Sequence, residues 1–540
     1  MHLTYRTALD TRNESEGSNA IGQANGGLQR FGPPVLPHGP YAPPDGGKKW
    51  RIALADSSSR FSTGCAGAIL TVRAPRTPGA SGARLAANMG PRIYGRSVDT
   101  ETRDPASEEA RDHSTRILVW MTLLALVAGV LAGAVGGAFR WLLVQADQLR
   151  LDVVSWSHEL GGAGWLIPVA MTTAAAVSAG LITRMIPLAA GSGIQHVEAV
   201  QRGEAEHAPL RVLPARFVGG LLSMGLGGMV LGREGPTVHM GATIGAWCGK
   251  IARATADEIR TMQSALAGAG LAVAFNAPIS GTLFCLEEIT HTIKIRYVVW
   301  TMASVVVAVM TSRLILGDHA DFRAPTIAEP AFSTLPVFAV FGLVVALFGV
   351  VYNRLILTFL AWFDALYRIP AVVRIGVIGA LIGVALSFDA DLVGGGDDLT
   401  QSLLAGQHLT FVGVAVIVVV RFLAGPLSYA AGTPGGLFAP MLALGALLGL
   451  IGGHVVDLIS PGMGTALMPA LMLVGMATMF TSVVRAPLTG AVLVMEMCAS
   501  TAVAVPLLAA SVTAVIVPQL LGSRPVYDLL RERMLAVEKR

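Results

Sequence analysis

Charged side chains are scarce in this 540-residue sequence: they make up 14% of it, against 53% for hydrophobic residues. With a mean hydropathy of +0.61, too few polar side chains remain to cover a water-soluble protein of this size. Cysteine is also scarce, and the four cysteines form no C-x-x-C pair, which favours small core side chains over a disulfide framework or a metal site. The net charge of +4 gathers at the chain ends and does not indicate nucleic-acid binding.

Long apolar runs are abundant instead. Residues 117–139 and 502–521 contain no charged side chain, and each run is long enough to cross a hydrocarbon layer of roughly 30 Å as a helix. Further apolar runs lie at 165–182, 298–311, 335–351 and 375–388. The sequence therefore predicts an all-α polytopic membrane protein. Basic residues precede the first run and follow the last, which favours cytoplasmic termini; these are Arg111, Arg116, Arg531, Arg533, Lys539 and Arg540.

The chain divides by composition. Residues 1–112 are rich in Gly, Pro, Ser and charge without sustained periodicity, and they lack the apolar segment of a secretory signal, so we expect a disordered polar tail. This tail is interpreted either as a basic segment on the membrane surface or as an extension with no role. Residues 113–533 form the predicted transmembrane domain. Residues 534–540 leave only a short cytoplasmic tail, too short for a soluble domain.

Comparison of the sequence with itself indicates a duplication. "GREGPTVHMGATIG" (232–245) aligns without gaps to "GLFAPMLALGALLG" (436–449), and "NAPISGTLFCLE" (276–287) aligns to "RAPLTGAVLVME" (485–496) at a nearly equal offset. Two matches in register predict an internal repeat, with halves at roughly 117–316 and 335–521. This comparison leaves open whether the halves are parallel or inverted.

The Gly- and Pro-interrupted segments suit an anion site. A helix N-terminus exposes unpaired N–H groups and the positive end of the helix dipole. Both "GREGPTV" and "GGLFAPM" predict helix starts, with Gly for the turn and Pro at a first helical position. If the duplication brings these starts together, they form a pocket for an anion. Ser192, between two glycines, can add a hydroxyl donor.

Glu234 is an acid in this otherwise apolar stretch. A carboxylate at the bilayer centre costs about 2.5–3.5 kcal/mol, and one helix start returns roughly 0.3–2 kcal/mol. We therefore expect several helix starts to hold Glu234 in the place of an anion, so that its protonation couples to anion passage. The alternative is a structural ion pair with Arg233, which is weakened because adjacent helical residues do not face each other. Arg233 is expected to pair elsewhere, for example with Glu198.

Two further features allow alternative interpretations. Glu287 and Glu288 end an apolar run and are either a water-facing helix end or a point of proton entry from the cytoplasm. Tyr527 follows the last apolar run, where a tyrosine usually anchors a helix at the membrane interface.

Four separated segments resemble, in order and spacing, the signatures of the ClC family of chloride channels and chloride/proton antiporters. They are "GSGI" (191–194), "GREGP" (232–236), "GGLFAP" (435–440) and Tyr527. The resemblance implies a homodimer with one anion pathway per subunit, and two inverted repeats of tilted, partly broken helices. It implies that the hydroxyls of Ser192 and Tyr527 and the backbone N–H groups of Leu437 and Phe438 bind the anion.

The resemblance also implies roles for two acids: Glu234 would be the external gating glutamate, and Glu288 the internal proton-transfer glutamate. The matching motif residues are Gly191, Gly193, Ile194, Gly232, Arg233, Gly235, Pro236, Gly436 and Pro440.

One departure from the family pattern is visible. Gln195 stands where Pro is common, and His196 stands where an acid is frequent. This departure bears on the helix start and on anion selectivity, whereas Ser192 resembles the chloride-preferring form.

The expected function is secondary active exchange of chloride for protons. The alternatives are a passive ClC-type chloride channel and an exchanger that prefers another anion such as nitrate. An enzyme is disfavoured, because "HELGG" lacks the second His of a zinc protease and "GAWCGKI" has Ile244 at the first Gly position of an ATP-binding loop. No metal or cofactor is predicted. The expected partners are chloride, protons, membrane lipid and a second subunit, in the inner (plasma) membrane.

Overall fold

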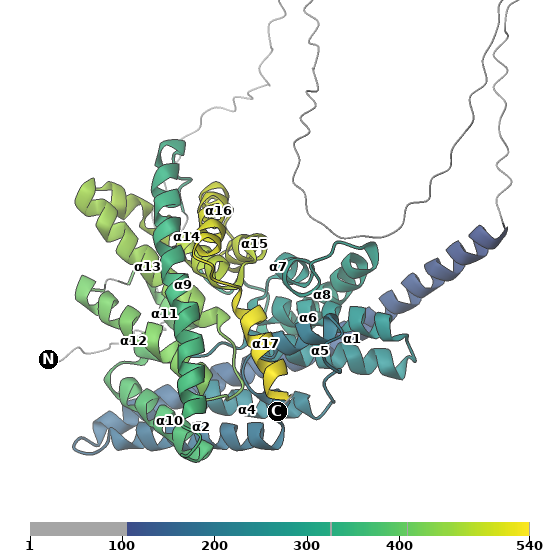
Figure 1. Cartoon of the computed structure of the whole chain (residues 1–540). Helices are drawn as coiled ribbons and strands as arrows, with labels where there is room; N and C mark the ends of the chain where they lie inside the picture. The colour runs from purple at the N-terminus through teal and green to yellow at the C-terminus, as the bar shows by residue number, and fades with distance from the viewer. Residues whose placement is uncertain (1–104, 325–326, 408, 539–540) are drawn as a thin grey trace, which may run out of the picture. The chain divides into compact units, whose positions relative to one another are not determined.

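The computed structural model describes residues 105–324, 327–407 and 409–538 (Figure 1), and this part of the chain is built from helices. The first half contains α1 (Pro105–Glu159), α2 (Leu166–Met185), α3 (Ile194–Gln201), α4 (Val212–Gly220), α5 (Glu234–Ile251), α6 (Ala256–Phe275), α7 (Pro278–Phe284) and α8 (Ile295–Leu316). The second half contains α9 (Leu335–Ala365), α10 (Ala371–Phe388), α11 (Asp397–Leu404), α12 (Phe411–Ala430), α13 (Phe438–Ile459), α14 (Met463–Val484), α15 (Pro487–Met497) and α16 (Ala504–Leu520). The last helix, α17 (Val526–Glu538), follows both halves.

Eight helices in the described ranges are long and apolar enough to cross a membrane. They are α1, α2, α8, α9 with the short turn before it, α10, α12, α13 and α14. Helix α16, formed by the run 502–521, has 17 residues and is at the lower limit of a span. The predicted polytopic membrane protein is thus confirmed.

The first helix begins earlier than expected. It starts at Pro105, within the tail that the composition predicted to be disordered up to residue 112, because the sequence from 105 onward has no helix-breaking residue before the apolar run. Residues 1–104, and with them the rest of the predicted tail, lie outside the described residues.

The two halves repeat the same packing. Helix α5 packs on α6 as α13 packs on α14, and α1 packs on α8 as α9 packs on α16, while α2 contacts α10 and α7 contacts α15 between the halves. The aligned Gly232 and Gly436 form an antiparallel bridge. Equivalent residues related by a two-fold axis lie in such an antiparallel arrangement, so the bridge is consistent with the predicted duplication.

Glycine allows the long buried helices to cross closely. A Cβ on Gly445 of α13 would lie 2.3 Å from the carbonyl oxygen of Gly475 in α14, and one on Gly475 would lie 2.1 Å from that of Gly445. The equivalent crossing of α5 and α6 uses Gly241 and Gly270, where an added Cβ would also lie 2.3 Å from backbone oxygen. Close helix contact through small residues is typical of membrane proteins. These crossings fix the direction in which α5 and α13 enter the centre of the protein.

Candidate functional site

The predicted helix starts meet in space. Gly232 and Gly436 exchange two backbone hydrogen bonds of 2.8 and 2.7 Å, which join the segments before α5 and α13. The segment before α3 joins them, since the Gly191 N–H donates to the Thr433 carbonyl (3.1 Å) and the Gly435 N–H donates to the Gly191 carbonyl (3.2 Å). Three helix N-termini, those of α3, α5 and α13, are therefore tied together by their backbones.

The helices begin slightly earlier than the proline positions predicted. Pro236 and Pro440 are third residues of α5 and α13, not first ones, because the helices already start at Glu234 and Phe438. A proline is tolerated there, since the first turn of a helix has no intrahelical acceptor for its N–H groups.

Two hydroxyl groups at this junction are free to bind an anion. Ser192 and Tyr527 are fully buried, and neither hydroxyl has a hydrogen-bond partner in the described part of the chain. The two hydroxyls lie near each other, but their geometry does not make a hydrogen bond between them. The ring of Phe438 packs against that of Tyr527 with 5.8 Å between centroids, and Leu437 is equally buried. Buried hydroxyls left without a partner mark a place for a polar ligand.

Arg216 of α4 lies behind Ser192 and was not identified from the sequence. Its guanidinium donates to the carbonyls of Gly191 (2.9 Å), Ser192 (3.0 Å), Leu188 (2.9 Å) and Ala190 (3.1 Å). These hydrogen bonds point the carbonyl groups of the loop toward Arg216. The backbone N–H groups at the start of α3 therefore stay available to a ligand. A buried cation without a carboxylate partner also raises the electrostatic potential of the pocket. The signal in the sequence was a lone arginine within the apolar "VLPARFVGG".

The second half repeats this arrangement. Arg421 of α12 donates to the carbonyls of Asp391, Val393 and Gly394 at 2.7–2.9 Å. These carbonyls belong to the loop before α11, whose N-cap Gly396 has the same left-handed conformation (φ 95°) as Gly193 before α3 (φ 83°). The loop before α11 is thus the counterpart of the Ser192 loop.

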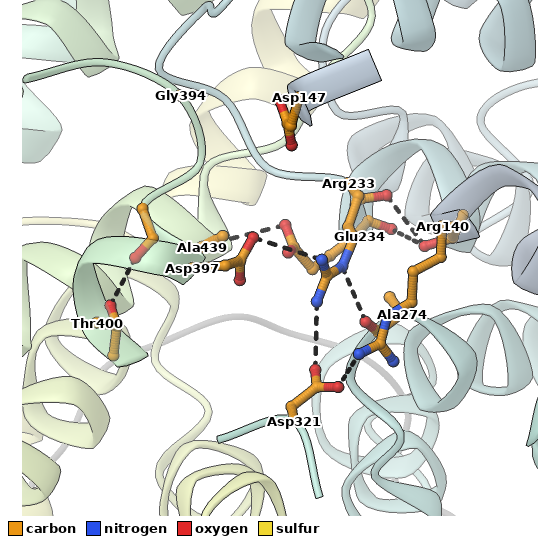
Figure 2. Close-up of polar contacts among 12 residues, drawn as sticks. Arg140, Asp147, Arg233, Glu234, Ala274, Asp321, Gly394, Asp397, Thr400 and Ala439 are labelled. Atoms are coloured by element: carbon orange, nitrogen blue, oxygen red, sulfur yellow. Dashed lines mark hydrogen bonds and ion pairs between the residues drawn. The ribbon is translucent and has the colours of Figure 1, made fainter. Parts of the chain in front are cut away.

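Glu234 is fully buried at the start of α5 and reaches the facing helix (Figure 2). Its Oε2 atom accepts a hydrogen bond of 3.4 Å from the backbone N–H of Ala439 in the first turn of α13, and its Oε1 atom has no partner among the described residues. The carboxylate therefore lies where the expected anion would bind. Only one N–H group holds it, where several were expected, because the other donors of this turn lie out of hydrogen-bond range.

Arg233 does not pair with Glu234. It donates to the Ala274 carbonyl (3.0 Å), to Asp397 (3.4 Å) and to Asp321 (3.2 Å). The suggested pair with Glu198 is wrong. Glu198 lies 3.9 Å from Arg531 instead, because α17 packs on α3.

The two neighbouring acids Glu287 and Glu288 have different environments. Glu287 accepts hydrogen bonds from the N–H groups of Leu488 (3.1 Å) and Thr489 (2.7 Å) and from the Thr489 hydroxyl, at the start of α15. Its counterpart Glu496 accepts the equivalent bonds at the start of α7, so the two halves cap each other's helices. Glu287 thus has a structural role.

Glu288 is buried in a π-helical turn that spans Cys285–Ile289. Among the described residues it has no hydrogen bond or ion pair, and it interacts electrostatically with Glu198, Asp528 and Arg202 of the adjoining α3 and α17 region. It is therefore the acid of the pair that remains available for proton transfer.

A cavity of about 320 Å³ adjoins the α3 start, and Gln195, His196, Arg216, Tyr429 and Arg533 contribute to its lining. The two residues that depart from the family pattern therefore face a space next to the Ser192 loop. His196 Nδ1 also lies 3.1 Å from His239 Nε2 of α5, a contact that joins α3 to α5.

Helix N-termini and buried hydroxyls that meet between broken helices of a multi-pass membrane protein are typical of membrane anion-transport proteins. Residues 174–519 match the family described as "Voltage gated chloride channel", and the chain belongs to this family, the ClC family. The chain is 34% identical over 430 residues to the H(+)/Cl(-) exchange transporter ClcA of Vibrio parahaemolyticus, covering 77% of this chain and 90% of the relative. ClcA of Vibrio cholerae is also 34% identical, over 433 residues and with the same coverage.

Solved structures of this family have the same fold as this chain. The structure of a slow cyanobacterial Cl⁻/H⁺ antiporter matches with a TM-score of 0.73 and 30% identity, over 78% of this chain and 99% of that one. A eukaryotic CLC transporter, at 22% identity and a TM-score of 0.63 over 77% of this chain and 74% of that one, supports the fold alone. The resemblance inferred from the four motifs and the ClC fold with inverted repeats are therefore confirmed.

Proposed function

We propose that this protein is a secondary active antiporter that exchanges chloride for protons. The observation that carries the proposal is the carboxylate of Glu234, which lies at the first turn of α13, at the same junction as two buried hydroxyls that have no partner in the described part of the chain. A carboxylate and a chloride ion are both anions that helix N-termini attract. They compete for one place, and this competition links proton binding to anion binding. The exchange activity named for the ClcA relatives and the cyanobacterial structure supports the same function.

The cycle follows from this competition. Ionised Glu234 occupies the pocket at the α13 start; once protonated, it loses its attraction to the helix dipole and can leave. Chloride then binds between the hydroxyls of Ser192 and Tyr527 and the N–H groups of Leu437 and Phe438. Departure of chloride lets Glu234 return after it has released its proton on the opposite side. Glu288 is the proton donor and acceptor at the inner end of this route.

Exchange is favoured over a passive channel because Glu288 is a buried acid without a structural bond partner in the described chain, whereas its neighbour Glu287 has one. Burial of an ionisable side chain within a membrane protein costs free energy, and a role of Glu288 in proton transfer explains why an acid is present there. We further propose chloride as the preferred anion, on the basis of the Ser192 hydroxyl. A homodimer in the inner (plasma) membrane, with both termini cytoplasmic, completes the proposal.

The test is coupled flux in liposomes that contain the purified protein. A chloride gradient should drive protons against their own gradient, and Glu234→Gln should pass chloride without moving protons. Glu329→Gln, at an exposed acid outside the helices, is the matched control and should retain coupling. Chloride flux without any proton movement in the unaltered protein would establish the channel alternative. A parallel measurement with nitrate and fluoride tests the anion preference.

A further inference from the structure

Four side chains of alternating charge form a connected series that includes Arg233 (Figure 2). Arg140 of α1 pairs with Asp321, Asp321 lies 3.2 Å from Arg233, and Arg233 lies 3.4 Å from Asp397 at the first position of α11. The exposed fraction of the side chain is 16% for Arg140, 2% for Asp321, 12% for Arg233 and 35% for Asp397. Asp397 is thus the end of the series that water reaches most easily.

This series determines where the positive charge of Arg233 acts. The guanidinium is held by Asp397, by Asp321 and by the Ala274 carbonyl. A buried cation with one carboxylate partner fewer keeps more uncompensated positive charge, which would act on the adjacent Glu234 as well as on Asp321. Asp397 therefore helps to keep Glu234 free of an ion pair that would hold it in its ionised form.

Asp397 also lies close to the place of Glu234 itself. A Cβ added to Gly395 would lie 3.3 Å from Asp397 Oδ2 and 3.9 Å from the Cβ of Ala439. Ala439 is the residue whose N–H group donates to Glu234. The two carboxylates thus flank the same residue of α13. Two acids at such short range disfavour each other's charged form.

We propose that Asp397 is a positioning residue for proton exchange at Glu234: by holding Arg233 and by adding a negative charge near Glu234, it favours the uptake of a proton from water on this side of the membrane. The proposal rests on the proposed exchange function. The charged groups that face this pair come from every surrounding element: Arg140, Asp147 and Arg150 of α1, Asp321 of the segment after α8, Arg233 just before α5, Asp398 of α11 and Arg421 of α12.

The test varies pH on one side of a planar bilayer at a time. In Asp397→Asn, the pH of half-maximal exchange on the side that Asp397 faces should fall by about one unit, equivalent to a tenfold higher proton activity, because a nearby negative charge has been removed. The same titration from the other side should not shift. Asp397→Glu keeps the charge and should restore the profile. Asp398→Asn removes an equal charge at the next residue, which among the described residues makes no hydrogen bond or ion pair with Arg233, and it should shift the profile less than Asp397→Asn.

The same substitution in a Glu234→Gln background separates the possible outcomes. If Asp397 acts through Glu234, Asp397→Asn changes neither the rate nor the pH dependence of chloride flux there. An unshifted profile in the single variant, or a changed chloride flux in the double variant, overturns the role of Asp397. Proton pumping by Glu234→Gln alone would instead overturn the proposed function. If the Asn variant does not fold, Asp397→Ser, which also removes the charge, takes its place in each comparison.

Discussion

Glu287→Gln tests whether the reciprocal helix caps hold the two halves together. Three hydrogen bonds from the start of α15 end on this carboxylate, two from backbone N–H groups and one from a hydroxyl. Bonds to a charged acceptor contribute about 1.5–3 kcal/mol each and neutral ones about 1 kcal/mol. The single amide oxygen of Gln can accept at most two of the three, so with the smallest of these values the variant should lose about 2.5 kcal/mol of folding free energy. For a chain of this length, that loss lowers Tm by up to about 5 °C.

The assay is the fraction of protein that stays folded in detergent after heating, measured by size-exclusion chromatography. Coupled flux is measured on the same preparations. Glu287→Gln should melt earlier and retain proton coupling. Glu288→Gln is the matched comparison, since it should melt as the unaltered protein does and lose proton flux. If Glu287→Gln melts normally, or if it uncouples transport while Glu288→Gln does not, the assignment of a structural role to one acid and proton transfer to the other is refuted.

Two further substitutions test the packing and the electrostatics. Gly445→Ala should lower the free energy of unfolding by about 1–3 kcal/mol, because the added Cβ would lie 2.3 Å from the Gly475 carbonyl oxygen. The control is Gly376→Ala, where the atom nearest to an added Cβ is 3.4 Å away. Equal thermal stability of the two variants would contradict the close crossing of α13 and α14. Arg216→Met should weaken chloride binding by about 1–2 kcal/mol, roughly tenfold in Kd by calorimetry, because it removes a buried cation whose guanidinium contacts the Ser192 carbonyl. Arg421→Met, the equivalent change behind the other loop, should change this Kd less, and equal effects would argue against a local role for Arg216.

The sequence was most informative where a pattern is repeated along the chain. The two aligned segments predicted that Gly232 and Gly436 are equivalent, and in the fold they bond directly to each other. The four motifs also identified Ser192, Tyr527 and Glu234, which the fold brings to one junction. Their roles in transport stay predictions until the flux experiments are made. Local composition was less informative about helix ends, since α1 begins at Pro105 inside the region expected to be disordered.

The contacts that the sequence did not reveal join residues that are far apart along the chain. Arg233 reaches Asp397 across 164 residues, and Glu287 reaches Thr489 across 202. No local spacing encodes such pairs, so Arg233 was given a wrong partner, and only the family resemblance distinguished Glu288 from Glu287.

The amino-acid sequence by itself determined that the chain is a duplicated, helical membrane protein with an acid in one of two equivalent helix starts, because hydropathy, glycine and proline positions are properties of the chain. Only the tertiary structure decided which charges compensate each other and which stay free. Charge pairing in a buried site depends on distances of a few ångströms between separate helices. Among the described residues, that pairing leaves Glu234 without an ion-pair partner and with a single N–H donor to its carboxylate.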